Sequence, residues 1–154
     1  MANEKDMKKA VEMYGVLCKA LDERNWNYQK EDEKLSVRFG VNGDDLSMSF
    51  RILVDADRGL FRLFSWLPFE MKERRIEGAL ASCYINSRLV DGCFDYNIET
   101  GGVLFRMTAS YRDSLIGTGL IAYMIDCACG TIDDYNDQFL MLEKGKLQPE
   151  DFNK

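Results

Sequence analysis

The segment "KLSVRFGVNGDDLSMSFRILV" (residues 34–54) decides the fold class of this chain. Its apolar residues recur at every second position on both sides of a central "NGDD". Alternation of this kind is typical of strands with one buried face, and Asn-Gly is a strong hairpin signal. The segment therefore predicts two antiparallel strands joined at Asn42-Gly43. The residues expected on the buried face are Leu35, Val37, Phe39, Val41, Leu46, Met48, Phe50, Ile52 and Val54.

Four further segments show strand character on either side of this hairpin. "WNYQK" (26–30) alternates before it, and "GLFRLFSWL" (59–67) follows it. Pro68 is expected to end the latter strand, because the residue before a proline is pushed to extended geometry and the sheet pairing then stops. "GCFDYNI" (92–98) and "GVLFRMTAS" (102–110) form a second predicted hairpin around a glycine-containing turn.

Three segments show helical spacing of apolar residues. They are residues 4–22, residues 69–88, and a third that starts at the capping-box pattern Ser110-x-x-Asp113 and runs to about residue 142. The stripes expected to face the core are Met7, Val11, Tyr14, Cys18 and Leu21 in the first helix, Ile76, Ala79, Leu80 and Cys83 in the second, and Ile116, Leu120, Met124, Cys127, Ala128, Thr131, Tyr135 and Leu142 in the third.

The expected order of elements is α-β-β-β-β-α-β-β-α. Consecutive strands joined by short turns must be antiparallel. The sequence thus predicts an α+β fold, an antiparallel sheet flanked by helices mainly on one face. A length of 154 residues suits a single domain over residues 1–154.

Composition restricts the classes of partner. The net charge is −6, and residues 89–154 carry eleven acidic against five basic residues, so nucleic acid is disfavoured as a partner. No apolar run reaches the roughly 18 residues that a membrane span needs. We see no secretory signal at the N-terminus and expect a cytoplasmic protein, in which five cysteines would be reduced.

"IDCACGTIDDYND" (125–137) has the residue types of a metal or redox site. In a helix, however, Cys127 and Cys129 diverge by about 200° and cannot hold one ion together. The chain has no histidine that could complete a zinc site. We therefore expect no metal and no cofactor, with Cys127 facing the core and Cys129 lying beside an acidic face.

The opposite face of the third helix is the candidate partner-binding surface. Gly119 and Gly130 each cost about 1 kcal/mol relative to alanine within a helix. The more ordinary interpretation is a solvated acidic face, but solvation alone would not compensate for that cost. Close approach of another backbone would compensate for it. The candidate partner-binding residues are Leu115, Gly119, Ala122, Asp126, Gly130, Asp133 and Asp137.

Catalysis has no visible residue set. Without histidine, Ser-His and Cys-His pairs cannot form. The paired Asp44-Asp45 falls in a predicted turn, where both carboxylates would be hydrated. We assign no catalytic residue.

The segment "YINSRLVDGCFDYNIETGGVLFRMTAS" (84–110) resembles the YbjN family of small bacterial proteins. The resemblance is carried by Ile85-Asn86, Gly92-Cys93-Phe94, Glu99 to Gly102, and Phe105-Arg106. It implies a fold like that of type III secretion chaperones, which commonly form homodimers. This chain has four predicted strands before its second helix, where those chaperones have three.

The resemblance implies a non-enzymatic protein-interaction module, chaperone-like or regulatory, in bacterial sensory signalling. Such a module would form a homodimer and would also bind an unknown protein partner. The dimer would use the Leu115–Ala122 end of the third helix, or otherwise the second helix or a sheet edge. Two alternatives stay open: an enzyme without histidine, and a small-ligand sensor that uses an aromatic face of the sheet. The aromatic residues of that face are Trp26, Phe50, Phe61, Phe64 and Trp66.

Overall fold

The computed structural model describes residues 2–153 and has the expected order of elements. Four strands precede the second long helix, although the first strand has only three residues. The elements are α1 (Glu4–Glu23), β1 (Gln29–Glu31), η1 (Asp32–Lys34), β2 (Ser36–Asn42), β3 (Ser47–Asp55), β4 (Leu60–Glu70), α2 (Arg75–Asn86), β5 (Cys93–Tyr96), β6 (Gly102–Ser110), α3 (Thr118–Glu143) and η2 (Pro149–Asn153).

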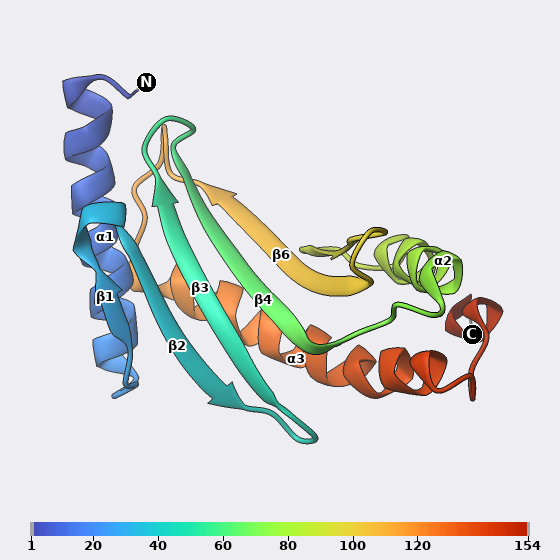
Figure 1. Ribbon diagram of the computed structural model, residues 1–154. Helices are drawn as coiled ribbons and strands as arrows, with labels where there is room; N and C mark the ends of the chain where they lie inside the picture. Colours follow the sequence, from blue (N-terminus) through green and yellow to red (C-terminus); the bar gives the residue numbers. More distant parts are fainter. Residues whose placement is uncertain (1, 154) are drawn as a thin grey trace.

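The six strands form one antiparallel sheet in the order β1-β2-β3-β4-β6-β5. In Figure 1, α3 runs behind the sheet, α1 stands beside β1, and α2 lies at the β5 end. The α+β architecture predicted from the sequence is confirmed. Pairing of β4 with β6 is the long-range step, since β5 and α2 lie between them in the chain.

One face of the sheet holds the core together with α1 and α3. The alternation in residues 34–54 is confirmed from β2 onward, because the inward residues of β2 and β3 are buried. Leu35 is an exception: it ends η1 with a left-handed φ of 47°, so β2 begins only at Ser36. The buried members of the predicted face are Val37, Phe39, Met48, Phe50, Ile52 and Val54.

The other face, which we call the open face, is covered by no helix among residues 2–153 (Figure 1). Its residues alternate with those of the core and form rows across the sheet through the strand register. The central residues of the open face are Arg38, Gly40, Ser49, Arg51, Leu53, Arg62, Phe64, Trp66, Leu104 and Arg106.

The prediction that Pro68 ends its strand is wrong, because β4 continues to Glu70. Trp66 pairs with Leu104 and Glu70 pairs with Gly102, so three residues of β4 lie opposite one residue of β6. The ladder is therefore already interrupted at Pro68. A proline is tolerated at such a bulge because no ladder hydrogen bond needs its missing N–H.

The predicted helix starts are also wrong. Ser110 cannot cap a helix because it is the last residue of β6 and pairs with Leu60. The helix α3 begins eight positions later, after Gly117. The helix α2 begins at Arg75 rather than residue 69, because the preceding residues extend β4.

The predicted core stripe of α2 is wrong in its phase. Ile76, Leu80 and Cys83 are exposed, with Ile76 at 70% and Leu80 at 44% of full accessibility. The inward face is made of smaller residues, because α2 packs closely against β5 and η2. Tyr96 of β5 lies so near Gly78 that a Cβ there would be 2.6 Å from its ring. The buried residues of α2 are Gly78, Ala81, Ser82 and Ile85.

The other two helices match in part. In α1 the predicted residues Tyr14, Cys18 and Leu21 are buried, but Met7 and Val11 are exposed. In α3 the core face is rotated by about one residue from the prediction, which places Met124, Ala128 and Leu142 correctly and leaves Cys127 only half-buried. The buried residues of α3 are Ile121, Met124, Ile125, Ala128, Ile132, Asn136, Phe139 and Leu142.

Candidate functional site

The acidic stripe of α3 is partly engaged by α1. Asp126 accepts hydrogen bonds from both terminal nitrogens of Arg24, at 2.7 and 2.6 Å. This guanidinium lowers the pKa of Asp126, and it also lies over the ring of Trp26 at 5.2 Å from the ring centroid. Asp126 therefore ties the end of α1 to α3.

Asp133 of α3 binds the loop of the β2–β3 hairpin. Its Oδ1 accepts a hydrogen bond from the backbone N–H of Asp44, at 3.2 Å. A Cβ at Gly43 would lie 2.4 Å from the same oxygen, so glycine lets the loop approach the helix.

The two helix glycines have no such role within this chain. Ideal Cβ atoms at Gly119 and Gly130 would meet no atom within 4 Å. Both residues are exposed, as is Asp137, while Ala122 is half-buried. The placement of Leu115 on this helix is wrong: it is exposed, but it lies in the loop three residues before α3. The structure thus leaves this part of the stripe accessible, and its role as a partner-binding surface stays a prediction.

The two cysteines of α3 are both half-buried, but their thiols differ in environment. Burial, followed by the nearby carboxylates of Asp126 and Asp133, raises the pKa of Cys129 to about 11. The thiol of Cys129 thus lies beside the acidic face, as the sequence predicted, but it is desolvated there. Both lie in a helix, as the sequence predicted.

Cys129→Ser is therefore expected to destabilise the protein more than Cys127→Ser. A hydroxyl placed at the desolvated position without an assured partner costs about 1–3 kcal/mol, whereas the change at Cys127 should stay below about 1 kcal/mol. Urea denaturation of both variants measures the difference. A larger loss for Cys127→Ser would restore the helical phase inferred from sequence.

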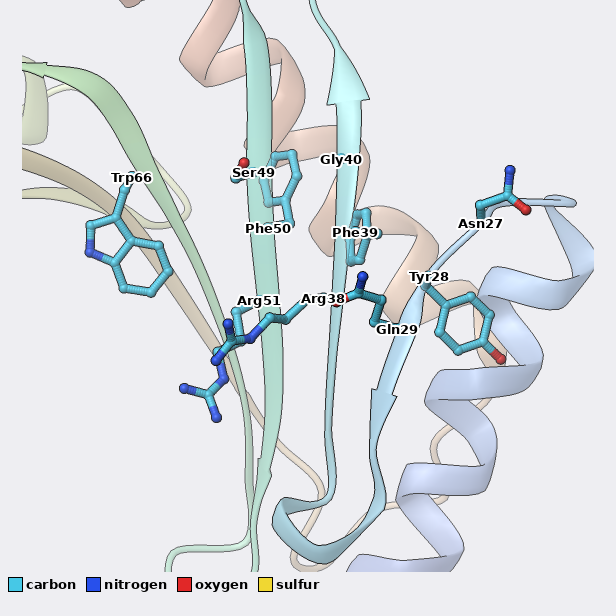
Figure 2. A pocket seen from close by; sticks show the side chains of 10 residues that line it. All are labelled: Asn27, Tyr28, Gln29, Arg38, Phe39, Gly40, Ser49, Phe50, Arg51 and Trp66. Atoms are coloured by element: carbon cyan, nitrogen blue, oxygen red, sulfur yellow. The ribbon is translucent and has the colours of Figure 1, made fainter.

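The open face contains a hollow of about 630 Å³. Figure 2 shows Trp66 at one side of it with the guanidinium groups of Arg38 and Arg51 nearby, while the ring of Tyr28 points toward α1. Trp66 is 52% exposed, although a large apolar ring is usually buried. The strand register places Gly40 opposite Ser49 and Ser49 opposite Trp66, so these three residues line up across the sheet.

Two arginines share one carboxylate at this hollow. Glu31 forms an ion pair with Arg38 at 3.1 Å, and it accepts hydrogen bonds from Arg51 at 3.0 Å and from the hydroxyl of Ser36 at 2.6 Å. The Ser36 hydrogen bond lowers the pKa of Glu31 most, with further lowering by the two arginines against an opposing effect of burial. One carboxylate cannot neutralise two guanidinium groups, so this end of the hollow keeps excess positive charge within an acidic protein.

A second hollow of about 650 Å³ lies on the other side of Trp66, where β4 bulges away from β6. Its lining is more apolar and includes Phe69, Ile98 and Leu104. Trp66 lines both hollows.

The aromatic face expected from sequence does not exist as one surface. Phe50 and Phe61 are buried in the core, whereas Phe64 and Trp66 lie on the open face, 6.0 Å apart between ring centroids. Trp26 packs on the core residue Phe39 at 5.6 Å. The alternation of β4 alone separates Phe61 from Phe64, since an odd spacing changes the face.

Residues 84–110, which carry the family resemblance, build the corner of α2, β5 and β6. Asn86 of α2 binds the backbone of Phe94 in β5 twice: its Oδ1 accepts from the N–H at 2.8 Å, and its Nδ2 donates to the carbonyl at 2.9 Å. These are the two groups that a further strand would bind. Asn86 thereby closes this edge of the sheet, a role that sequence reasoning missed because it depends on contact between two elements.

The remaining residues of the resemblance also have structural roles. Arg106 and Asp95 form a two-point ion pair on the open face, at 2.6 and 3.2 Å, and Arg106 holds the pKa of Asp95 below its usual range. Gly92 and Gly101 have φ of 74° and 78°. A Cβ at Gly101 would meet the backbone of Met71 at 2.6 Å, so only glycine fits this turn.

Within residues 2–153, no cluster of three or more cysteine and carboxylate side chains is arranged to hold a metal ion. Nor does that part of the chain contain a helix long and apolar enough to cross a membrane.

Comparison with known proteins gives a match over most of the chain. The family model of YbjN, described as "Putative bacterial sensory transduction regulator", matches residues 14–141. No curated protein matches the chain in sequence.

Three solved structures share the fold at low sequence identity. A crystal structure described as "YbjN, a putative transcription regulator from E. coli" has 10% identity and a TM-score of 0.59, over 81% of this chain and 92% of that one. The crystal structure of the ExsC–ExsE complex has 11% identity and a TM-score of 0.55, over 80% and 90%. An uncharacterised protein from Methanothermobacter thermautotrophicus has 16% identity and a TM-score of 0.51, over 89% and 98%.

Proposed function

The chain belongs to the YbjN family, and from this we propose that it acts as a homodimeric protein-interaction module in regulation. The family description is that of a regulator and not of an enzyme, which agrees with the non-enzymatic protein expected from sequence. The fold is shared with the ExsC–ExsE complex, in which two proteins are bound together. We place the protein in the cytoplasm, where its free cysteines would stay reduced.

The observation that carries the proposal is the exposed apolar stripe of α2. Ile76, Leu80 and Cys83 recur at helical spacing and point away from the core. A helix on a globular protein normally turns its apolar stripe toward the core. An apolar stripe that is exposed instead is typical of a surface that another chain covers. A two-fold axis near Leu80 would pair the stripe with its own copy.

The third helix fits a symmetric interface less well. Its exposed stripe carries Asp137, whose charge would face its own copy if two such stripes met across a two-fold axis. Between Ile76 and Cys83, α2 contains one charged residue, Glu77. The carboxylate of Glu77 contacts Arg74 at 3.5 Å. The acidic stripe of α3 would then stay accessible to the unknown protein partner.

Leu80→Glu is expected to convert the dimer to a monomer without unfolding it. The side chain is already exposed in the monomer, so the new charge costs little there but would be buried without a partner in the dimer. Light scattering on a sizing column at micromolar concentration should then give a mass near 17.7 kDa instead of twice that value.

Leu115→Glu is the matched control, because Leu115 is fully exposed in the loop three residues before α3. It should leave the dimer intact, and so should Gly119→Leu. A monomeric wild-type protein would refute the homodimer. Loss of the dimer in the Leu115 and Gly119 variants alone would move the interface to α3.

Cys83 offers an independent measurement, since it lies in the proposed interface and is exposed. A short bis-maleimide should link two copies through Cys83 in the wild-type protein, and Leu80→Glu should abolish the link. The variant Cys83→Ser controls for reaction at the half-buried cysteines.

A further inference from the structure

We propose that the hollow beside Trp66 on the open face binds a small molecule with a flat aromatic body and a carboxylate. This binding goes beyond the proposed function and does not depend on dimerisation. It rests on the floor of the hollow, on the exposed indole of Trp66 and on the charged end of the hollow.

The floor is formed by the cross-strand pair Gly40 and Ser49. Glycine within a strand costs about 0.5–1 kcal/mol relative to alanine, so its presence needs a reason. The fold supplies none: the φ of Gly40 is not positive, and a Cβ there would only touch the carbonyl of Met48 at 3.7 Å, an ordinary contact. What glycine does at this position is leave the backbone bare beneath the hollow.

The aromatic wall of the hollow is Trp66, since the ring of Tyr28 turns toward α1, where its hydroxyl donates to Asp22 at 2.9 Å. Trp66 stands on β4, next to Phe64 along the same face. A bare floor beside an exposed indole accepts a flat ring, which gains by stacking on the indole and by leaving water.

The charged end specifies the polar group of the ligand. Arg38 and Arg51 lie directly opposite each other on β2 and β3, and Gln29 pairs with Arg38 from β1. No acidic residue lines the hollow, and the Nε of Arg51 has no hydrogen-bond partner within the described part of the chain. Guanidinium groups bind carboxylates at two points, so a carboxylate complements both the charge and the geometry of this end.

The volume agrees with a ligand of this size. Sites for small molecules measure about 300–1,000 Å³, and the hollow of about 630 Å³ falls within that range.

The test is a titration of the full chain with 2-naphthoate, followed by calorimetry and by NMR shifts of Trp66 and Gly40. We expect a dissociation constant below about 1 mM, with the largest shifts at those two residues. 2-Naphthalenemethanol keeps the ring without the charge, and cyclohexanecarboxylate keeps the charge without the flat ring. Each should bind at least tenfold more weakly.

Two variants separate the site from the fold. Gly40→Val fills the floor and should abolish binding without lowering Tm, because β-branched residues suit an exposed strand position. Thr108→Val, on the same face outside the hollow, is its matched control and should bind normally. Arg38→Gln should weaken 2-naphthoate by about tenfold or more but leave the neutral analogue unchanged.

Three results would overturn the proposal. The first is the absence of saturable binding of 2-naphthoate at millimolar concentration. The second is unchanged affinity in a folded Gly40→Val protein. The third is that the NMR shifts caused by 2-naphthoate are confined to another surface, such as the second hollow. None of these results bears on the dimer, which the mass measurement decides separately.

Discussion

Phe94→Ala is expected to lower the free energy of unfolding by about 3–5 kcal/mol, the largest loss of any substitution considered for this protein. Phe94 is 2% exposed and lies at the centre of an aromatic cluster. Its ring contacts Phe105, Phe139 and Tyr135 edge-on, with centroids 5.2, 5.2 and 6.0 Å away. Phe94 of β5 packs against Tyr135 and Phe139 of α3, so the cavity left by its ring would weaken the packing between these two elements.

Urea denaturation of the wild-type protein and the variant measures this loss, and we expect Tm to fall by roughly 10 °C. Phe64→Ala is the matched control: it removes the same ring from the same sheet, but on the open face, where the side chain is half-buried. Its cost should stay near about 1 kcal/mol. Equal costs for the two variants would contradict the assignment of core and open faces.

Asn86→Ala is expected to cost about 2–4 kcal/mol. The substitution removes two hydrogen bonds and leaves the N–H and the carbonyl of Phe94 without partners at a partly buried place. It also uncovers the backbone of the edge strand β5, which could then pair with other chains. We expect lower stability together with aggregation that increases with protein concentration.

Asn97→Ala provides the comparison, because Asn97 also makes two hydrogen bonds to backbone, with Glu99 and Thr100. That turn is exposed, so water can replace the lost contacts and the cost should stay below about 1 kcal/mol. Hydrogen exchange at the Phe94 amide should accelerate in the Asn86 variant only. Unchanged exchange there would show that Asn86 does not close the edge.

The sequence predicted the strands well because burial repeats at every second residue and the repeat is local. Residues 34–54 alone identified both strands of the first hairpin and their buried face. The helix starts were harder, since the capping pattern at Ser110 and the end of β6 compete for the same residues. The sheet pairing with Leu60 decides that competition, and it involves a segment fifty residues away.

The candidate sites divide in the same way. Sequence located a stripe on α3 but could not show that Arg24 and Asp44 bind two of its aspartates, because those contacts join distant segments. The hollow beside Trp66 was missed for the same reason. Its only local signal was Gly40 within an otherwise regular strand, and its walls come together only when β1, β2, β3 and β4 lie side by side.

The sequence by itself determined the order of elements, the antiparallel sheet, the inward face of β2 and β3, and the family. Each of these follows from periodicity or from motifs read along a short stretch of chain. Tertiary structure alone decided which faces of α2 and α3 are buried. Both helices carry apolar residues on more than one side, so the side that packs is chosen by the shape of the sheet: α2 turns its small residues toward Tyr96 and leaves Ile76 and Leu80 outside.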